Sequence, residues 1–224
     1  MNYQTIKVNK TSSILSISLD RPSIGNAFNT VMRDELFSVL KFIEVDIDIK
    51  VVLITGSGQN FCTGADLTEF GTSPSLITAR DIRRQRDLWA LMLSCPVPIV
   101  SAIQGQCIGS GLEIALYSDI RIATTDSQFS MPETTLGLIP AAGGTQTLPR
   151  TVKMSKAFNL LLAGESINGI DAKKAGLISR VTTLDKLNND VSNIIQMIIN
   201  NPRPYLTLLK SQISSAWTSQ RIPS

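Results

Sequence analysis

Residues 98–146 read PIVSAIQGQCIGSGLEIALYSDIRIATTDSQFSMPETTLGLIPAAGGTQ, and the rest of the chain is interpreted outward from them. The segment sets two glutamates, Glu113 and Glu133, among four glycine-bearing turns. Its pattern predicts a buried strand, a Gly-rich turn, a short apolar helix, a second strand and a loop that carries Glu133. Free backbone N–H groups at the start of that helix would attract negative charge.

Composition restricts the class of protein. The chain has 224 residues, of which 43% are hydrophobic and 17% charged, and a net charge of +3. This length is enough to bury a large core. The low charged fraction suggests a surface partly covered by other subunits. No basic run is interleaved with aromatic residues, so we expect no nucleic-acid partner, whereas an anionic small molecule remains a possible partner.

The absence of histidine excludes several mechanisms. Ser-His-Asp and Cys-His nucleophiles and His-rich zinc sites all need a histidine, and the chain has none. Cys62, Cys95 and Cys107 lack metal-type spacing and are odd in number, which is typical of reduced core thiols, and no metal site is expected. The N-terminus lacks a leader pattern and no apolar run approaches the ~18 residues of a membrane span, so we expect a cytoplasmic protein.

Hydrophobic periodicity on both sides of the central segment predicts an α/β fold. The expected strands are 15–19, 51–54 and 177–181, and the expected helices are 29–43, one from Asp66, 76–93, 155–163, 171–175, 184–199 and 205–217. We therefore predict an α/β core over residues 1–183 followed by a C-terminal helical region, 184–224. The arginines between 80 and 86 are interpreted as a solvated helix face, with contact to an anionic ligand as the alternative.

Two common motifs fit poorly. Gly109-Ser110-Gly111 lacks the third glycine of a dinucleotide fingerprint, and no Gly-Lys-Ser/Thr occurs anywhere in the chain. Gly105 to Gly109 has the outline of a nucleophile elbow around Cys107, but there is no histidine base to activate the thiol. A carboxylate mechanism is what remains.

Three segments together resemble the crotonase (enoyl-CoA hydratase/isomerase) superfamily. They are NFCTGADL at 60–67, IGSGLE at 108–113 and PETTLGLIPAAGGTQ at 132–146. Arg21-Pro22 with Asn26-Ala27 and two later segments, 163–165 and 171–177, follow the same order, so that the resemblance covers roughly residues 10 to 185. Each motif alone is weak, but the set is highly specific.

This resemblance implies a fold, a substrate and a site. The fold would be a crotonase-like spiral of ββα turns, assembled as trimers or hexamers, and the substrate a coenzyme A thioester, as in fatty acid metabolism. Coenzyme A would be part of the substrate, with no separate cofactor. The backbone N–H groups of Ala65 and Ser110 would form an oxyanion hole, and Glu113 and Glu133 would manage protons. Substrate contacts would come from these residues: Ala27, Gly64, Ala65, Asp66, Leu67 and Gly109.

Paired carboxyl groups suit the addition of water to a double bond. The reaction needs one general base and one general acid at the same place. Two carboxyls around one water cannot both ionise freely, so one of them has its pKa raised. The structural alternative is that Glu113 braces its helix and Glu133 is a surface loop residue.

Two departures from the family pattern affect the site. Ser110 stands where most members have glycine, and a serine held at positive φ would cost about 1–2 kcal/mol and displace the oxyanion N–H. The sequence stops at Ser224, sooner than typical members, whose last helices help to close the acyl pocket. We nevertheless predict self-association, because the C-terminal helices carry many apolar residues: Ile194, Ile195, Ile198, Ile199, Leu206, Leu208, Leu209 and Trp217.

Three functions are compatible with these patterns. The first is an enoyl-CoA hydratase, which the presence of both glutamates favours over a one-carboxylate isomerase. The second is a sister reaction on a CoA thioester, such as double-bond isomerisation or dehydration. The third is a non-catalytic or RNA-binding relative, against which the absence of a basic patch counts. The acyl group cannot be read from the sequence.

Overall fold

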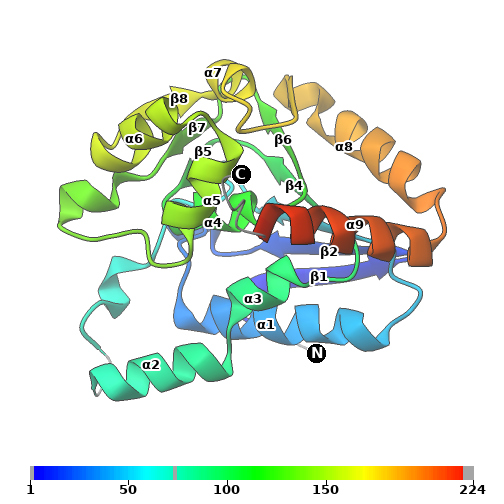
Figure 1. Cartoon of the computed structure of the whole chain (residues 1–224), viewed down its shortest axis with the longest axis horizontal. Coiled ribbons are helices and arrows are strands. Elements are labelled where there is room, and N and C mark those ends of the chain that lie inside the picture. The colour runs from blue at the N-terminus through cyan, green and yellow to red at the C-terminus, as the bar shows by residue number, and fades with distance from the viewer. Residues whose placement is uncertain (1–2, 73–74, 219–224) are drawn as a thin grey trace, which may run out of the picture.

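A computed structural model describes residues 3–72 and 75–218, and two β-sheets organise them (Figure 1). The larger sheet has the order β1-β2-β3-β4-β6-β9, with β1 antiparallel at one edge and the other strands parallel. Its strands are β1 Ile6–Thr11, β2 Ile14–Leu19, β3 Val51–Gly56, β4 Ile99–Ile103, β6 Ile120–Thr124 and β9 Arg180–Thr182. The smaller sheet, in the order β5-β7-β8, consists of β5 Gln106–Ile108, β7 Gln128–Ser130 and β8 Ser166–Asn168.

Helices cover both faces of the larger sheet. Helix α1 (Thr30–Val45) begins after Asn29, whose side chain accepts the N–H of Met32, and it packs its apolar stripe into the main core. Helix α8 (Leu184–Ile199) packs Leu187, Val191 and Ile195 against the opposite face. Figure 1 shows the two helices on opposite sides of the strands. The prediction of a strand buried on both faces at 51–54 is confirmed by β3.

Short second strands give the fold its repeated ββα turns. After β4 the chain forms β5 and then helix α4 (Ser110–Leu116). After β6 it forms β7 and then a 3₁₀ turn, η3 (Pro132–Leu136), and helix α5 (Gly144–Thr151). The remaining helical elements are η1 Pro22–Ile24, η2 Leu67–Glu69, α2 Leu76–Gln85, α3 Leu88–Leu93, α6 Met154–Leu162, α7 Gly169–Lys174 and α9 Arg203–Thr218. The predicted strand–turn–helix order around Glu113 is therefore correct.

Three predicted elements are wrong in extent. The helix expected over 76–93 is two helices, because the chain leaves the helix at Arg86 and Asp87 restarts it by accepting the N–H of Ala90 at 3.0 Å. The helix expected from Asp66 is only the single 3₁₀ turn η2. The strand expected over 177–181 is the shorter β9, and Leu177 is instead a buried loop residue.

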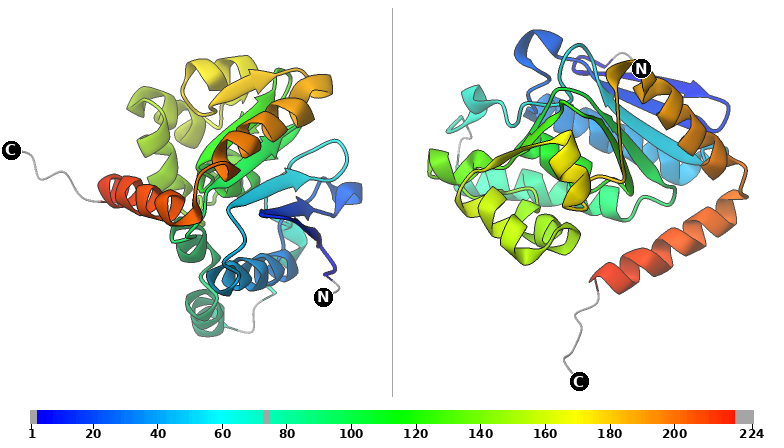
Figure 2. Two further views of the ribbon diagram at one scale, coloured as in Figure 1. Left: turned by 90° about the vertical axis from the view of Figure 1, so that its right-hand side faces the viewer. Right: turned by 90° about the horizontal axis from the view of Figure 1, so that it is seen from above.

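The isoleucines of α8 on which the self-association prediction depends pack within the chain itself. Ile195 is buried and Ile194, Ile198 and Ile199 are partly buried against the chain's own sheet, so that part of the self-association argument is wrong. Helix α9 runs along the outside of the body (Figure 2), and its Leu208 and Leu209 are 57% and 60% exposed. The side chain of Trp217 lies outside the described residues.

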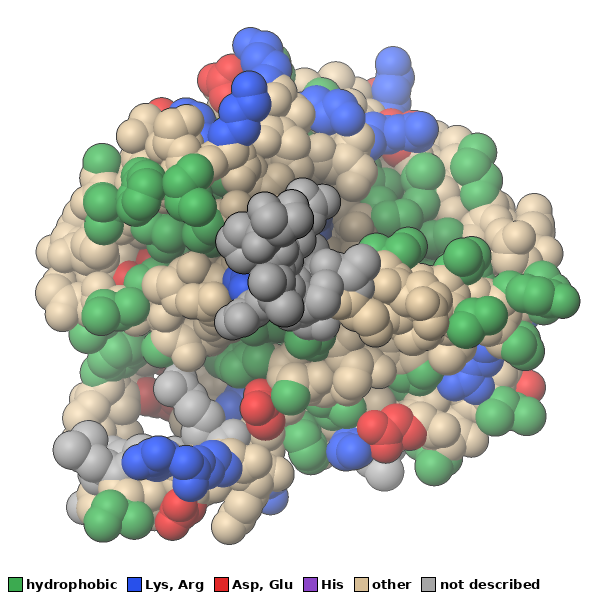
Figure 3. Space-filling view, viewed as in Figure 1, with side chains coloured by type: hydrophobic (Ala, Val, Ile, Leu, Met, Phe, Trp, Pro, Cys, Tyr) green, Lys and Arg blue, Asp and Glu red, His purple; other side chains and the backbone are tan. Residues whose placement is uncertain are grey.

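Charged side chains hold α9 to the core and cover α2. Arg203 donates to the carbonyl of Ile43 at 3.0 Å, and Lys210 forms an ion pair with Asp119 at 2.7 Å. Lys and Arg side chains gather over α2 (Figure 3), where Arg80 and Arg84 are exposed, as a solvated face requires. Among the described helices, none combines the length and the apolar character needed to cross a bilayer.

Candidate active site

Two loops from distant parts of the sequence run side by side in the same register. Cys62 and Cys107 form a parallel β-bridge, in which the Cys62 N–H donates to Gln106 O and the Ile108 N–H donates to Cys62 O, both at 3.0 Å. Two residues further along each loop, Gly64 lies opposite Gly109. A Cβ added to Gly109 would lie 3.7 Å from Gly64 Cα. Ala65 and Ser110 follow these two glycines and so occupy corresponding positions on the two loops. All three cysteines are buried and free, as expected of core thiols.

The N–H groups of Ala65 and Ser110 are not used to hold the fold. The bridge between Phe28 and Ala65 uses the Gly64 carbonyl and the Asp66 N–H, each at 2.8 Å. Ser110 is the first residue of α4, where an N–H has no acceptor within the helix. Among the described residues, no hydrogen bond has either N–H as its donor. Two neighbouring free donors are suited to an oxygen that gains negative charge.

The positive φ angle in this turn belongs to Gly109 and not to Ser110. Gly109 has φ 50° and ψ −120°, whereas Ser110 is helical, so the strain considered for a serine at position 110 does not arise. A side chain at position 109 would also crowd the carboxyl group of Glu133. A Cβ there would lie 2.7 Å from Oε1 of Glu133.

Glu113 projects from α4 into a loop that wraps its carboxylate. The residue is 1% exposed, and its Oε1 accepts the N–H groups of Ala142 and Gly144, both at 2.9 Å. A Cβ at Gly144 would lie 3.0 Å from this oxygen, which explains a glycine there. Both backbone donors act on the same oxygen of the carboxyl group. The carboxylate is thus bound to the 142–144 loop and does not cap its own helix.

Glu133 lies on the other side of the same turn in a different environment. It belongs to η3 and is half-buried; its Oε1 packs against Gly109, and its Oε2 is buried with no hydrogen-bond donor among the described residues. Burial is the main cause that raises the pKa of Glu133 above its usual range. Such a carboxyl group keeps its proton to higher pH than a solvated glutamate, and Glu133 is not a solvated loop residue.

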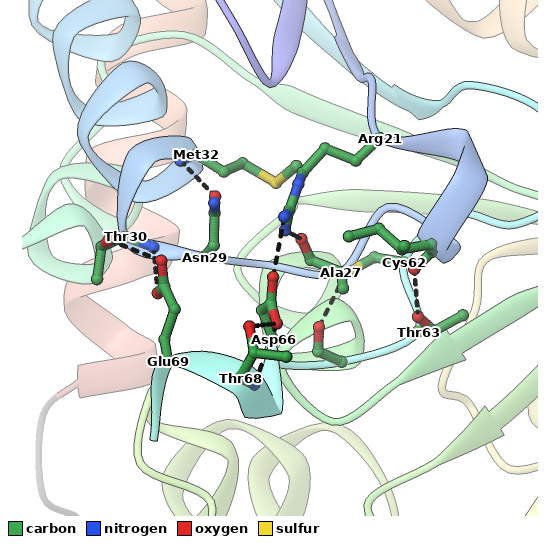
Figure 4. A network of polar contacts seen from close by, with 12 residues as sticks. Arg21, Ala27, Asn29, Thr30, Met32, Cys62, Thr63, Asp66, Thr68 and Glu69 are labelled. Carbon is green, nitrogen blue, oxygen red and sulfur yellow. Dashed lines mark hydrogen bonds and ion pairs between the residues drawn. The ribbon is translucent and has the colours of Figure 1, made fainter. Parts of the chain in front are cut away.

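A polar network fixes the loop that contains Gly64 and Ala65 (Figure 4). Arg21 forms an ion pair with Asp66 at 2.9 Å and donates to the carbonyl of Ala27 at 2.6 Å. Hydrogen bonds from Thr68 and then from Arg21 are the main causes that lower the pKa of Asp66. Of the predicted substrate contacts, Ala27 and Asp66 therefore belong to this network.

Leu67 begins η2 next to the network and is 56% exposed. Gly64 and Gly109 lie between the network and the two glutamates. The predicted site residues thus form one continuous region.

Sequence reasoning did not assign a role to Asn26, which lies between η1 and α1 and joins that segment to the loop after β3. Its side chain is fully buried and its backbone has φ 59°. Its Oδ1 accepts the Arg21 N–H at 2.9 Å, and its Nδ2 donates to the carbonyls of Ser57 and Asn60 at 2.9 and 2.8 Å. Asn26 appeared in the sequence only as part of the Asn-Ala motif, and that motif was the available signal.

An aromatic wall was also missed. Trp89 of α3 stacks on Tyr117 with ring centroids 5.5 Å apart, and Phe28 lies 5.7 Å from Trp89. A cavity of about 310 Å³ lies beside these rings and the 141–143 loop. Nothing in local sequence brings positions 28, 89 and 117 together. Within the described part of the chain, no three His, Cys, Asp or Glu side chains cluster as a metal site would require.

The family of the chain follows from comparison with known proteins. Residues 9–223 match the family model described as enoyl-CoA hydratase/isomerase. The chain belongs to the enoyl-CoA hydratase/isomerase family and has the crotonase fold. Proteins of this family process coenzyme A thioesters.

Two curated relatives illustrate the similarity. The chain is 38% identical over 178 residues to 2,3-dehydroadipyl-CoA hydratase of Escherichia coli, which covers 80% of this chain and 69% of the relative. It is 32% identical over 219 residues to a probable enoyl-CoA hydratase of Mycobacterium leprae, and this match covers 98% of this chain and 84% of the relative.

Solved structures agree with this assignment. The structure of enoyl-CoA hydratase from Bacillus anthracis matches with a TM-score of 0.90 at 32% identity, over 97% of this chain and 85% of that one. A putative enoyl-CoA hydratase of Thermobifida fusca, solved in complex with CoA, matches with a TM-score of 0.90 at 25% identity, over 97% and 87%.

Proposed function

We propose that this chain is an enoyl-CoA hydratase, which adds water across the α,β double bond of an acyl-CoA thioester. The observation that carries the proposal is the unequal environment of two neighbouring glutamates. Glu113 has one oxygen held by two backbone N–H bonds, whereas Glu133 has a buried oxygen without a donor among the described residues and a pKa that burial raises. Water addition needs a base and an acid of this kind at one place.

Each group has a defined task in the proposed reaction. The Glu113 carboxylate takes a proton from water while the water oxygen bonds to the β-carbon. The electron pair of the double bond moves toward the thioester, whose oxygen gains negative charge and accepts hydrogen bonds from the Ala65 and Ser110 N–H groups. Glu133 gives its proton to the α-carbon. The product is a 3-hydroxyacyl thioester, and return of one proton from Glu113 to Glu133 through solvent restores the pair.

The oxyanion donors are expected to supply much of the rate. Removing one such donor typically costs about 10²–10³ in turnover. Because the Gly64 and Gly109 backbones are in contact, both donors are held by the fold before substrate arrives. The names of the relatives support the assignment, since both curated proteins described above are called hydratases.

Double-bond isomerisation is the second candidate. One carboxyl group can carry a proton between two carbons of the acyl chain, and Glu113 is only 1% exposed in this structure. In that reaction Glu133 alone would transfer the proton, and Glu113 would only hold the 142–144 loop.

A paired assay separates the two reactions. Purified protein is given 2-enoyl-CoAs of several chain lengths, and loss of the conjugated enoyl-thioester absorbance reports hydration. The matching 3-enoyl-CoAs report isomerisation by a gain of the same absorbance. We expect hydration to be faster by at least tenfold. Turnover of the 3-enoyl substrates alone would replace the hydratase with an isomerase, and no turnover of either set would contradict both reactions.

A further inference from the structure

The cavity of about 310 Å³ lies directly behind the loop that holds Glu113. Its wall includes Ala142, whose N–H donates to Glu113, and the neighbouring Gly143, whose Cβ, if present, would lie 2.2 Å from the Tyr117 hydroxyl. Trp89 and Ala90 of α3 form the opposite side with Asp87, the residue that caps α3. The cavity and the Glu113 carboxyl group therefore share the 142–144 loop, which borders the cavity on one side and binds Glu113 on the other.

The charges around the cavity are of one sign. Among the described residues that line the cavity, none is Lys or Arg, and Asp87 is the one residue with a charged side chain. The preceding residue, Arg86, forms an ion pair with Asp34 of α1 and so is engaged elsewhere. Burial raises the pKa of Tyr117, and the negative charges of Glu113 and Asp87 raise it further. Both carboxylates therefore act on the same wall of the cavity.

We propose that this cavity receives the acyl group and selects acyl groups with an uncharged far end, with Asp87 as the specificity-determining residue. The proposal rests on the function proposed above, because it concerns the same site. An acyl chain that ends in a carboxylate would bring a further negative charge between Asp87 and Glu113, with no cation in the cavity wall to balance it. An acyl chain that ends in a methyl or an ester group adds no charge beside Asp87, and it can pack on Leu93 and on the Trp89–Tyr117 wall.

Three substrates of similar size isolate the effect of charge. They are 2-enoyl-CoAs with a six-carbon acyl chain that ends in a methyl group, in a carboxylate, or in the methyl ester of that carboxylate. We expect kcat/KM for the carboxylate to be about tenfold lower than for its ester, on the scale of like charges several ångströms apart near a protein surface. The ratio should approach one as salt rises, because salt screens charges and leaves shape unchanged.

Two variants change the charge of the wall in opposite ways. Asp87→Asn removes the negative charge and keeps a side chain that can cap α3, so the carboxylate-to-ester ratio of kcat/KM should rise about threefold. Ala90→Lys adds a cation at an exposed helix position and should raise the ratio further. Asp126→Asn is the matched control, because it removes the same charge outside the cavity wall. Asp126 lies in a turn next to Thr125, whose carbonyl is close to Gly169 of α7. The ratio should not change in this control.

The outcomes separate this proposal from the proposed function. Equal kcat/KM for the carboxylate and the ester, or an equal loss for both relative to the methyl-ended substrate, would overturn selection by charge. Calorimetric binding of the saturated hexanoyl- and adipyl-CoA needs no turnover, so it measures the same preference independently. The protein could bind hexanoyl-CoA more tightly than adipyl-CoA, lose part of this preference in Asp87→Asn, and still hydrate none of the substrates. This result would support selection by the charge of Asp87 and would overturn the proposed hydratase activity. Equal binding of the two would overturn the charged wall.

Discussion

The carboxyl group of Glu133 has one buried oxygen, Oε2, that receives no hydrogen bond from the described residues. At position 113 the same chemical group accepts two backbone N–H bonds. The difference arises from neighbours that are distant in sequence, namely Gly109 for Glu133 and the 142–144 loop for Glu113. The family resemblance singled out both residues as candidates, but it could not show how differently the fold surrounds them.

The raised pKa of Glu133 makes its charge a cost to folding. Above the ordinary pKa of glutamate the unfolded chain ionises this group freely, whereas the folded chain resists ionisation, so stability falls as pH rises toward the folded pKa. Glu133→Gln should therefore raise the melting temperature at pH 7, and the gain should vanish below about pH 4, where both states are protonated. Thermal unfolding of both proteins at equal concentration across this pH range tests the prediction. A stabilisation that does not change with pH would show that charge is not its cause.

The second residue-scale prediction concerns the oxyanion donors. Ala65→Pro deletes an N–H that makes no hydrogen bond within the described residues, so it should lower turnover by about 10²-fold or more and leave the bridge between Phe28 and residue 65 in place. Ser110→Gly keeps the backbone donor and should retain activity. Turnover is measured beside circular dichroism as the check on folding. An inactive but folded Ser110→Gly protein would assign a catalytic role to the hydroxyl.

Elements with a long, regular pattern were predicted well. The four residues whose spacing predicted α1, Met32, Leu36, Leu40 and Ile43, are all buried, and α8 has the predicted limits. Three-residue strands such as β5 and β7 were missed, because so few residues show no periodicity and the strands are defined by their pairing within the β5-β7-β8 sheet. The break between α2 and α3 contains neither Gly nor Pro, and Asp87 as an N-cap was its one local signal.

The prediction at the scale of elements concerns Asn26, whose side chain joins two segments of the chain. Its Nδ2 ties η1 to the loop after β3, which leads to Ala65. Asn26→Asp keeps the acceptor for Arg21 and places a carboxylate oxygen against carbonyls, so we expect a loss of about 1–3 kcal/mol in the free energy of unfolding. We also expect kcat to fall about tenfold with a smaller change in KM, because a displaced donor weakens the transition state more than the bound substrate.

Asn9→Asp is the matched control for this change. Asn9 is exposed on β1 and its side chain bonds only its neighbour Thr11, so the same change of charge should leave stability and kcat nearly unaltered. Urea unfolding gives the stability, and steady-state kinetics at a temperature where both variants are folded give kcat. Lost stability with unchanged kcat would show that Asn26 supports only the fold.

For the whole molecule, exposed apolar side chains point to self-association. Hydrophobic side chains gather over α6 in Figure 3, and those of α6 and the adjoining η3 region are largely solvent-exposed in the single chain: Leu136 56%, Ile139 74%, Met154 56%, Phe158 53% and Leu162 68%. The sequence had suggested the C-terminal helices instead. The isoleucines of α8 pack on the chain's own sheet, whereas Leu208 and Leu209 of α9 remain exposed. Periodicity shows which face of a helix is apolar, but not what covers it.

We predict a trimer or hexamer held by this surface. Light scattering at micromolar concentration should give a mass several times the 24.3 kDa of one chain, unchanged in moderate salt, which screens charge pairs and not apolar contacts. Phe158→Glu should lower the mass, whereas Ile77→Glu, at the still more exposed position on α2, should not. The mass of a single chain for the unaltered protein would contradict the prediction.

The central claim is that Glu113 and Glu133 act on one water molecule as a unit. Its most direct test is the hydration rate of a 2-enoyl-CoA by the unaltered protein, Glu113→Gln, Glu133→Gln and the double variant. We predict that each single change lowers kcat at least ~10²-fold and that the double variant is far less than multiplicatively worse, because loss of either group already stops the shared step. Full hydration activity in either single variant, with the fold intact, would contradict the account.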